Sequence, residues 1–535
     1  MPKQSDNGKY IQNKKQNIID NSYSANNSKS IFSSRNLAFI GMVIGMFMAI
    51  LDIQIVASSL PVIGAGLSAS SEELSWIQTA YIIAEVVVIP LTGFTAKLLS
   101  TRVSYVIAAT GFTIMSIACA LSSNLESIII FRALQGFFGG AMIPTIFGIA
   151  YIIFTPEERP IVIAIIGAIV TLAPTLGPTL GGYITDILSW HFMFLLNVPT
   201  GILVIFLVNK YANFDKPDYS LLNNFDYLGV FLLITSLGSI QYILEEGAQK
   251  DWFDSNLILN LTIYSTIGIF LLIYHELKTE KPILDLYALK NSNFAIGCII
   301  TFILGVGLYG AIFLLPIFLG SEVIGLNTLQ IGIIMAVMGI SQFIAAPIAA
   351  IMTKQQVDKK LMMLLGITGY AYGCYANSFM TEQTRFYELI YPQLIRGFSL
   401  MFCFVPINDL SLGTLPKNRL QDASGLYNLM RNLGGAFGLA IINTKLSNNV
   451  IANKEILSSN LNSTDKYVQV TKENIEYFLI GKVNDPEKGA FSIINQILSG
   501  NSFIISINNI FAYLGFVFIL GILLIPFMKN TYKND

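Results

Sequence analysis

The stretch WIQTAYIIAEVVVIPLTGFTAKL, residues 76–98, is apolar along most of its length and carries one carboxylate, Glu85, near its middle. A run of this length can cross the hydrocarbon core of a bilayer, roughly 30 Å thick, as a single helix. Two further runs of this kind contain Asp52 and Arg132. Because ionisable side chains are costly in hydrocarbon, their presence predicts functional sites inside membrane-spanning helices.

The composition of the 535-residue chain is that of a polytopic membrane protein. Hydrophobic residues make up 53% of the chain and charged residues only 12%, about half the charged share of an ordinary soluble domain. The formal net charge of -1 gives no reason to expect nucleic acid as a partner. The four cysteines lie in apolar runs, without a CxxC pair or a neighbouring histidine, so they are interpreted as core residues and no metal site is predicted.

The apolar runs predict an all-α membrane protein with fourteen spanning helices. Their predicted ranges are 37–59, 74–97, 103–122, 127–153, 160–184, 193–209, 228–245, 257–275, 294–319, 328–352, 361–380, 387–412, 423–444 and 508–528. Residues 1–36 are rich in Ser, Asn, Gln and Lys, which predicts a disordered cytoplasmic tail and not a cleaved signal peptide.

The basic residues predict the orientation of these helices. With the N-terminus in the cytoplasm, the loops on the cytoplasmic side carry Lys97, Arg102, Arg159, Lys210, Lys216, Lys278, Lys281, Lys290, Lys354, Lys359, Lys360, Lys417 and Arg419. The short loops on the other side carry only Lys250 and Arg385. We therefore expect both termini in the cytoplasm and residues 446–506, which are polar and Asn-rich, in a long periplasmic loop.

An internal repeat predicts the architecture. At nearly constant offsets, Pro90, Lys97 and Arg102 recur as Pro347, Lys354 and Lys359, and Gln135-Gly136-Phe137 recurs as Arg396-Gly397-Phe398. A parallel repeat of this kind predicts two six-helix bundles, residues 37–209 and 294–528, with the helix pair 228–275 inserted between them. The alternative is chance matching between membrane helices that contain Gly and Pro.

Several motifs resemble a known family. The segments LDIQIVASSLP (51–61), FRALQG (131–136), APTLGPTLGG (173–182) and WHFMFLLNVPTG (190–201) resemble the fourteen-helix drug:proton antiporter branch of the major facilitator superfamily. Within that branch, the EmrB type of inner-membrane exporter is most similar in the segments DWF (251–253), PILDL (282–286) and NFAIGC (293–298). Their order across fourteen spans makes the resemblance specific.

The resemblance implies the major facilitator fold and a proton-coupled exporter of small amphipathic or hydrophobic compounds in the bacterial inner membrane. It implies no enzymatic activity and no cofactor, because the proton gradient supplies the energy. It also implies a periplasmic adaptor protein and an outer-membrane channel as partners. A facilitator or importer of the same fold and a non-transporting membrane sensor are the alternatives, since a fold alone does not define a function.

Asp52 and Arg132 are predicted to be partners. Counting about 1.5 Å per helical residue places them at equal depth in the same half of the protein, where each alone would be an unpaired charge. The pair has two interpretations: a switch, in which proton binding to Asp52 releases Arg132, or a permanent ion pair that locks two helices together.

Glu85 is the stronger candidate for proton uptake, because it has no equally obvious cation and desolvation favours the neutral form of a buried carboxyl group. A carboxyl group near mid-membrane can exchange a proton against cargo. The alternatives are a glutamate that stays protonated and hydrogen-bonded to a neighbouring helix, or one that helps to bind cationic cargo in a water-filled cavity.

The segment 173–182 concentrates helix-breaking and small residues, which permit a kink and let another helix approach closely. The resemblance implies that this antiporter motif lines the contact between the two halves and helps to govern their rocking. The alternative is ordinary small-residue packing. The candidate gating residues of this motif and of the segment 131–136 are Pro174, Gly177, Pro178, Gly181, Gly182, Gln135 and Gly136.

The loop that contains Gly93, Lys97 and Arg102 is a candidate cytoplasmic gate. The superfamily usually has an acid in this loop, and here Lys97 replaces it. That departure puts in doubt a latch between an acid in the loop and a helix terminus. Both basic residues also qualify as plain topology determinants.

Arg396, Asp409 and Arg431 are secondary candidates in the second half, because they are embedded in the membrane or nearly so. The alternative is that each side chain snorkels to a nearby interface.

Overall fold

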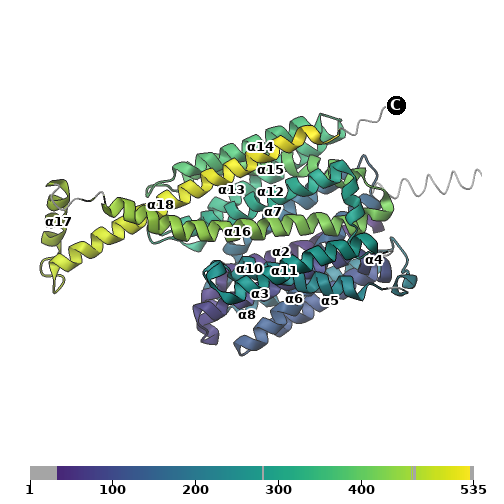
Figure 1. The fold of residues 1–535 in the computed structure, drawn as a ribbon, viewed down its shortest axis with the longest axis horizontal. Helices are drawn as coiled ribbons and strands as arrows, with labels where there is room; N and C mark the ends of the chain where they lie inside the picture. The colour runs from purple at the N-terminus through teal and green to yellow at the C-terminus, as the bar shows by residue number, and fades with distance from the viewer. Residues whose placement is uncertain (1–32, 224, 280–281, 460, 462–465, 530–535) are drawn as a thin grey trace, which may run out of the picture.

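The computed structural model describes residues 33–223, 225–279, 282–459, 461 and 466–529, and throughout these residues all regular secondary structure is helical. Figure 1 shows long helices running side by side, with most helices of the N-terminal half in one bundle and those of the C-terminal half in another. The predicted tail, residues 1–36, lies almost entirely outside the described residues. Ser33 caps the first helix by accepting a hydrogen bond from the Asn36 backbone.

The N-terminal half contains the helices of the first six predicted spans. These are α2 (Ser34–Leu67), α3 (Ser71–Val88) continued by η1 (Ile89–Leu91) and α4 (Thr92–Leu99), α5 (Thr101–Ala120), α6 (Leu125–Ile153), α7 (Arg159–Ile187), and α8 (His191–Leu195) with α9 (Asn197–Tyr211). The inserted pair is α10 (Tyr227–Glu246) and α11 (Asn256–Lys278).

The C-terminal half repeats this arrangement. Its helices are α12 (Ser292–Gly320), α13 (Thr328–Lys354), α14 (Lys359–Ala376), α15 (Phe386–Ser411), α16 (Leu420–Ser459), α17 (Lys466–Leu479), and α18 (Pro486–Leu520) continued by η8 (Gly521–Phe527). We call the end of the bundle where α2 and α16 begin and η8 ends the terminus face. The opposite end, where α17 lies, is the distal face.

Each of the fourteen predicted runs lies almost entirely within one helix or within two or three consecutive helices, although α16 and α18 extend far beyond their runs. Twelve of the described helices are long and apolar enough to span a membrane, and α14 and α16 are not among them. The polarity of α16 has a structural reason, because its Asn428, Arg431 and Asn432 side chains point into the protein, where they form hydrogen bonds with other side chains.

The same close contact occurs in both halves and supports the internal repeat. A Cβ atom on Gly136 in α6 would overlap the Tyr81 carbonyl group in α3, and one on Gly397 in α15 would overlap the Met338 carbonyl group in α13. The absence of a side chain lets the two helix backbones touch. Equivalent positions of the repeat, Gly136 and Gly397, therefore make the same kind of close helix contact.

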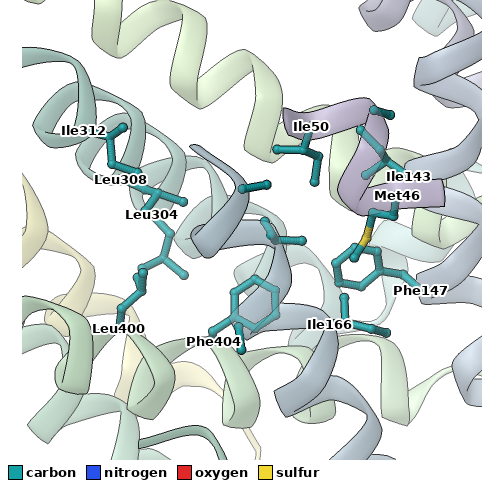
Figure 2. Close-up of a cluster of buried hydrophobic side chains, with 14 of the residues drawn as sticks. Met46, Ile50, Ile143, Phe147, Ile166, Leu304, Leu308, Ile312, Leu400 and Phe404 are labelled. Carbon is teal, nitrogen blue, oxygen red and sulfur yellow. The ribbon is translucent and has the colours of Figure 1, made fainter. Parts of the chain in front are cut away.

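The two halves share one apolar core. Figure 2 shows part of it, with Met46, Ile50, Ile143, Phe147 and Ile166 from the first half and Leu304, Leu308, Ile312, Leu400 and Phe404 from the second. The rings of Phe147 and Phe404 lie 6.2 Å apart between centroids. Along the rest of the contact, α7 packs on α13, and α16 packs on α6 and α4. The inserted helix α10 packs on both α3 and α16, so it contacts both halves.

Residues 446–506, predicted as a long periplasmic loop, are largely helical, and their place outside the membrane stays a prediction. Helix α16 continues to Ser459, and α18 already begins at Pro486, with α17 between them, so this segment forms a helical protrusion at the distal face (Figure 1). Asn453 donates to the Ser506 hydroxyl at 2.9 Å and thereby joins the two long helices. Apolarity marks only the part of a helix that lies in lipid, so it does not detect helices that extend into water.

Gly136→Ala tests the contact between α3 and α6. We expect it to lower the free energy of unfolding by about 1–3 kcal/mol, because the added methyl group would overlap backbone atoms of Tyr81. Gly238→Ala is the matched control, since the nearest atoms there lie 3.7 Å from the added carbon. Denaturation in detergent, followed by circular dichroism, measures both. Equal loss of stability in the two variants would contradict the close contact.

Candidate functional site

The predicted contact between Asp52 and Arg132 is confirmed. Arg132 Nη1 on α6 lies 2.5 Å from Asp52 Oδ2 on α2, and both side chains are buried. The carboxylate also accepts hydrogen bonds from Gln135 Nε2 at 3.1 Å and from Asn197 Nδ2 at 2.6 Å. Each carboxylate oxygen therefore has at least one donor.

Further buried groups complete this network. Ser116 on α5 accepts hydrogen bonds from Gln135 at 2.8 Å and from Asn197 at 3.3 Å. The Arg132 guanidinium lies 4.1 Å from the centre of the Tyr81 ring, and its Nε donates to the Ile77 carbonyl at 3.2 Å. The network thus joins α2, α3, α5, α6 and α9 through charge-assisted hydrogen bonds.

This geometry favours the permanent ion pair over the switch. Releasing Arg132 would break several hydrogen bonds at once and leave a buried charge unpaired. Sequence reasoning did not assign a role to Asn197, although it lies in the segment 190–201, and it missed Ser116, which carries no motif. The polarity of Asn197 within an apolar run was the one available signal.

Glu85 lies at the contact between the two halves. Its side chain is only 4% exposed, and Asn432 Nδ2 on α16 donates to its Oε1 atom at 3.2 Å. A hydrogen bond to a neighbouring helix was one of the interpretations, and that helix belongs to the other half. No salt bridge involves Glu85 within the described part of the chain.

The snorkelling interpretation is wrong for Arg396 and Arg431, which are 1% and 3% exposed. Arg431 Nη2 donates to Asn428 at 2.7 Å, and Arg396 donates to the Tyr370 hydroxyl at 3.3 Å. Both guanidinium groups are enclosed by helices and do not reach the surface. Asp409 is different, because it is partly exposed and pairs with Lys359 at 2.6 Å near the terminus face.

The Pro- and Gly-rich segment of α7 does line the contact between the halves. A Cβ atom on Gly182 would overlap Thr328 of α13, and one on Gly177 would overlap Gln54 of α2. The Thr171 hydroxyl donates a hydrogen bond to Gln342 of α13. Helix α7 runs unbroken through Pro174 and Pro178. The segment is therefore packed on both sides by small-residue contacts, and its role in rocking stays a prediction.

The candidate gate loop forms an ion pair with the other half. Lys97 in α4 pairs with Asp422 at the start of α16, and Gly93 packs against the Asp422 backbone. Residues 93–102 themselves contain no acid. The acid of this pair, Asp422, stands in the first turn of α16, and the base, Lys97, stands in the last turn of α4. Arg102 is exposed and takes part in no salt bridge within the described residues.

Two repeated helical bundles, with ionisable side chains buried within and between them, define a polytopic membrane transporter. The sequence profile of the Major Facilitator Superfamily matches residues 42–439, and the chain belongs to this superfamily.

Curated relatives match along most of their length. The colistin resistance protein EmrB of Acinetobacter baumannii is 37% identical, over 92% of this chain and 96% of the relative. The multidrug export protein EmrB of Escherichia coli K12 is 31% identical, over 92% and 95%. The fatty acid resistance protein FarB of Neisseria gonorrhoeae is 28% identical, over 93% and 97%.

Solved structures agree on the fold. The human organic anion transporter MFSD10 matches with a TM-score of 0.56 and 12% identity, over 92% of this chain and 99% of that one. The proton:xylose symporter XylE matches with a TM-score of 0.57 and 13% identity, over 92% and 95%. At these identities the likeness concerns the fold alone.

Arg132→Met and Asp52→Leu, singly and together, test whether the pair is structural. We expect each single substitution to cost about 3 kcal/mol of stability or more, because it leaves the partner buried and unpaired, and the double variant to cost less than the two single effects combined. The free energy of unfolding in detergent, measured for the wild type and the three variants, gives the coupling energy of the pair. Arg35→Met, which breaks the partly exposed pair with Glu158, is the control and should have little effect. Additive losses would contradict the coupling.

Proposed function

We propose that this protein is a drug efflux transporter that exports small amphipathic or hydrophobic compounds across the bacterial inner membrane in exchange for protons. The named activities of its relatives support this proposal: multidrug export, colistin resistance and fatty acid resistance. The two-bundle fold suits alternating access, in which cargo binds between the halves and the halves rock around it. Transport of this kind needs no enzymatic step.

The observation that carries the proposal is the position of Glu85 between the halves. A charged Glu85 accepts a hydrogen bond from Asn432 on α16, and protonation removes the charge from that contact. A hydrogen bond to a charged acceptor is roughly twice as strong as a neutral one. Proton binding therefore changes the free energy of the contact between α3 and α16, which a proton-driven conformational change requires.

Among the three candidates for proton coupling, we assign the transported proton to Glu85. Asp52 and Arg132 lie inside the first half, where their network involves only helices of that half. Their proposed role is to keep the first half rigid while it rocks. The proton gradient is the proposed source of energy, and no other cofactor enters the proposal.

We place the terminus face in the cytoplasm and the distal face in the periplasm, because the basic loops lie on the terminus face. The protrusion formed by α16, α17 and α18 then extends into the periplasm (Figure 1). From the resemblance to the EmrB type, we propose that a periplasmic adaptor protein and an outer-membrane channel continue the export path. The protrusion is the surface that such an adaptor would meet first.

Glu85→Gln tests the proton site in everted vesicles with a pH gradient imposed across the membrane. Gln keeps the size and a hydrogen-bonding oxygen but cannot exchange a proton, so we expect gradient-driven uptake of a fluorescent amphipathic dye to fall to the level of vesicles without the protein. Dye binding to the purified variant should persist. Glu126→Gln, an exposed residue of α6, is the control and should retain uptake.

Gradient-driven uptake by Glu85→Gln at the wild-type rate would remove Glu85 as the proton site. Wild-type dye movement that follows only the dye's own gradient would show a facilitator. A folded wild-type protein that moves no dye of any class would favour a sensor.

A further inference from the structure

The inserted helix pair contains two buried carboxyl groups that the proposed function does not use. Asp226 stands directly before α10, and Glu276 lies in the last turn of α11. Their exposed fractions are 8% and 0%. Because a buried polar atom is costly without a partner, the contacts of the four carboxyl oxygens show what these groups can bind.

One oxygen atom of each carboxyl group has partners. Asp226 Oδ1 accepts a hydrogen bond from the Gly229 backbone at 2.8 Å and lies 2.7 Å from His275 Nε2. Glu276 Oε2 accepts a hydrogen bond from the Leu284 backbone at 3.2 Å. These contacts fix the direction of both side chains.

The other oxygen atom of each group faces a common small space. Neither Asp226 Oδ2 nor Glu276 Oε1 has a hydrogen-bond partner within the described part of the chain. A Cβ atom on Gly229 would lie 2.9 Å from Glu276 Oε1 and closer still to Asp226 Oδ2. The two unpartnered oxygens therefore converge over Gly229, where any side chain would displace them.

Two charged carboxylates in this arrangement would repel each other. Like charges at short range in a buried site favour the state in which one of the two groups is neutral, and the proton then belongs to the pair. A charged carboxylate can only accept hydrogen bonds, whereas a protonated one can also donate. A single proton therefore turns the repulsion between the two groups into an attraction.

The charged groups on the neighbouring elements have other partners. Those groups are His275 on α11, Lys97 on α4, Asp422 on α16 and Asp285 in the segment 282–291. Lys97 lines a cavity together with Asp226 but pairs with Asp422. Asp285 pairs with Arg419. His275 contacts the opposite oxygen of Asp226, so among the described residues no base faces the two converging oxygens.

The two carboxyl groups stand where the inserted pair meets the rest of the protein. Phe225, which precedes Asp226, packs on Phe94 of α4 in the first half, with 5.2 Å between the ring centroids. Glu276 binds the backbone of the segment 282–291, which leads into α12 of the second half. A change of charge at this point therefore acts on the connection of the inserted pair to both halves.

We propose that Asp226 and Glu276 share one proton and form a second proton-binding site, at the terminus face and separate from Glu85. The shared proton holds the two side chains together. Its loss places two like charges side by side and weakens the hold of α11 on the segment 282–291. The site goes beyond the proposed function, because it needs neither cargo nor a proton gradient.

Infrared spectroscopy of the purified protein tests for the shared proton, because a protonated carboxyl group has a C=O band that a carboxylate lacks. We expect the wild type to show one such band at neutral pH that Glu276→Gln removes. His275→Gln removes the other titratable group beside Asp226, and Glu126→Gln removes an exposed acid. Both controls should keep the band.

Asp226→Asn tests whether the proton is shared. In this variant the band should disappear at a pH roughly one unit or more below that of the wild type, because the neighbouring negative charge is gone. Asn is as good a helix N-cap as Asp, so α10 should keep its start. A cooperative thermal transition shows that each variant is folded.

Thermal unfolding in detergent should follow the same proton. The folded pair holds a proton that the separated groups of the unfolded chain release, so stability falls as pH rises through the point where the pair loses it. We expect Glu276→Gln to lose less stability than the wild type between about pH 5 and about pH 9, the range in which buried carboxyl groups titrate. His275 remains in this variant, so the difference isolates the carboxyl pair.

An infrared band that persists in Glu276→Gln would rule out the site. A band with an unshifted midpoint in Asp226→Asn would also rule it out, because burial alone would then keep the proton on Glu276. A band lost on addition of sodium or magnesium at constant pH would show a metal cation in place of the proton and would overturn the proposal. None of these measurements involves transport, so the site and the proposed function can fail independently.

Discussion

A charge inside a bilayer must be enclosed by protein and matched by polar partners, and this constraint shapes the first half of the molecule. The Arg132 guanidinium and the Asp52 carboxylate lie 2.5 Å apart, and both side chains are buried within the protein. Asn197 donates a further hydrogen bond to the carboxylate. Because any helix that moved away would leave a charge or a donor unsatisfied, the network holds the bundle as one body.

Because the first half is rigid, relative movement is confined to the contact between the two halves. The groups at that contact are held less tightly: Glu85 has one hydrogen-bond donor across it, and Lys97 meets Asp422 beside a cavity. Between these points the halves touch mainly through apolar side chains and the small residues of α7, with one buried hydrogen bond from Thr171 to Gln342. Apolar contacts have no preferred direction, so the halves can slide there, while the polar contacts set which arrangement is favoured.

The partnership of Asp52 with Arg132 was predictable because depth in a membrane is almost a one-dimensional coordinate. Helices cross the bilayer at about 1.5 Å per residue, so sequence position converts directly into depth. The same argument does not say which helices are neighbours around the bundle, and so it did not place Glu85 against Asn432. Nor did it distinguish Arg431, which is enclosed by the protein, from Asp409, which is near the surface.

The sequence by itself determined the class of protein, the order of its apolar helices and the repeat that makes two bundles, because hydrophobic length and periodicity are local properties of the chain. Only the tertiary structure decided that α16 continues as a protruding helix, that Asn197 and Ser116 complete the buried network, and that Asp422 supplies the acid opposite Lys97. Those features depend on contacts between residues on different helices, 145 positions apart for Asn197 and Asp52 and 325 for Lys97 and Asp422. The packing of helices around one another selects such contacts without leaving a local pattern.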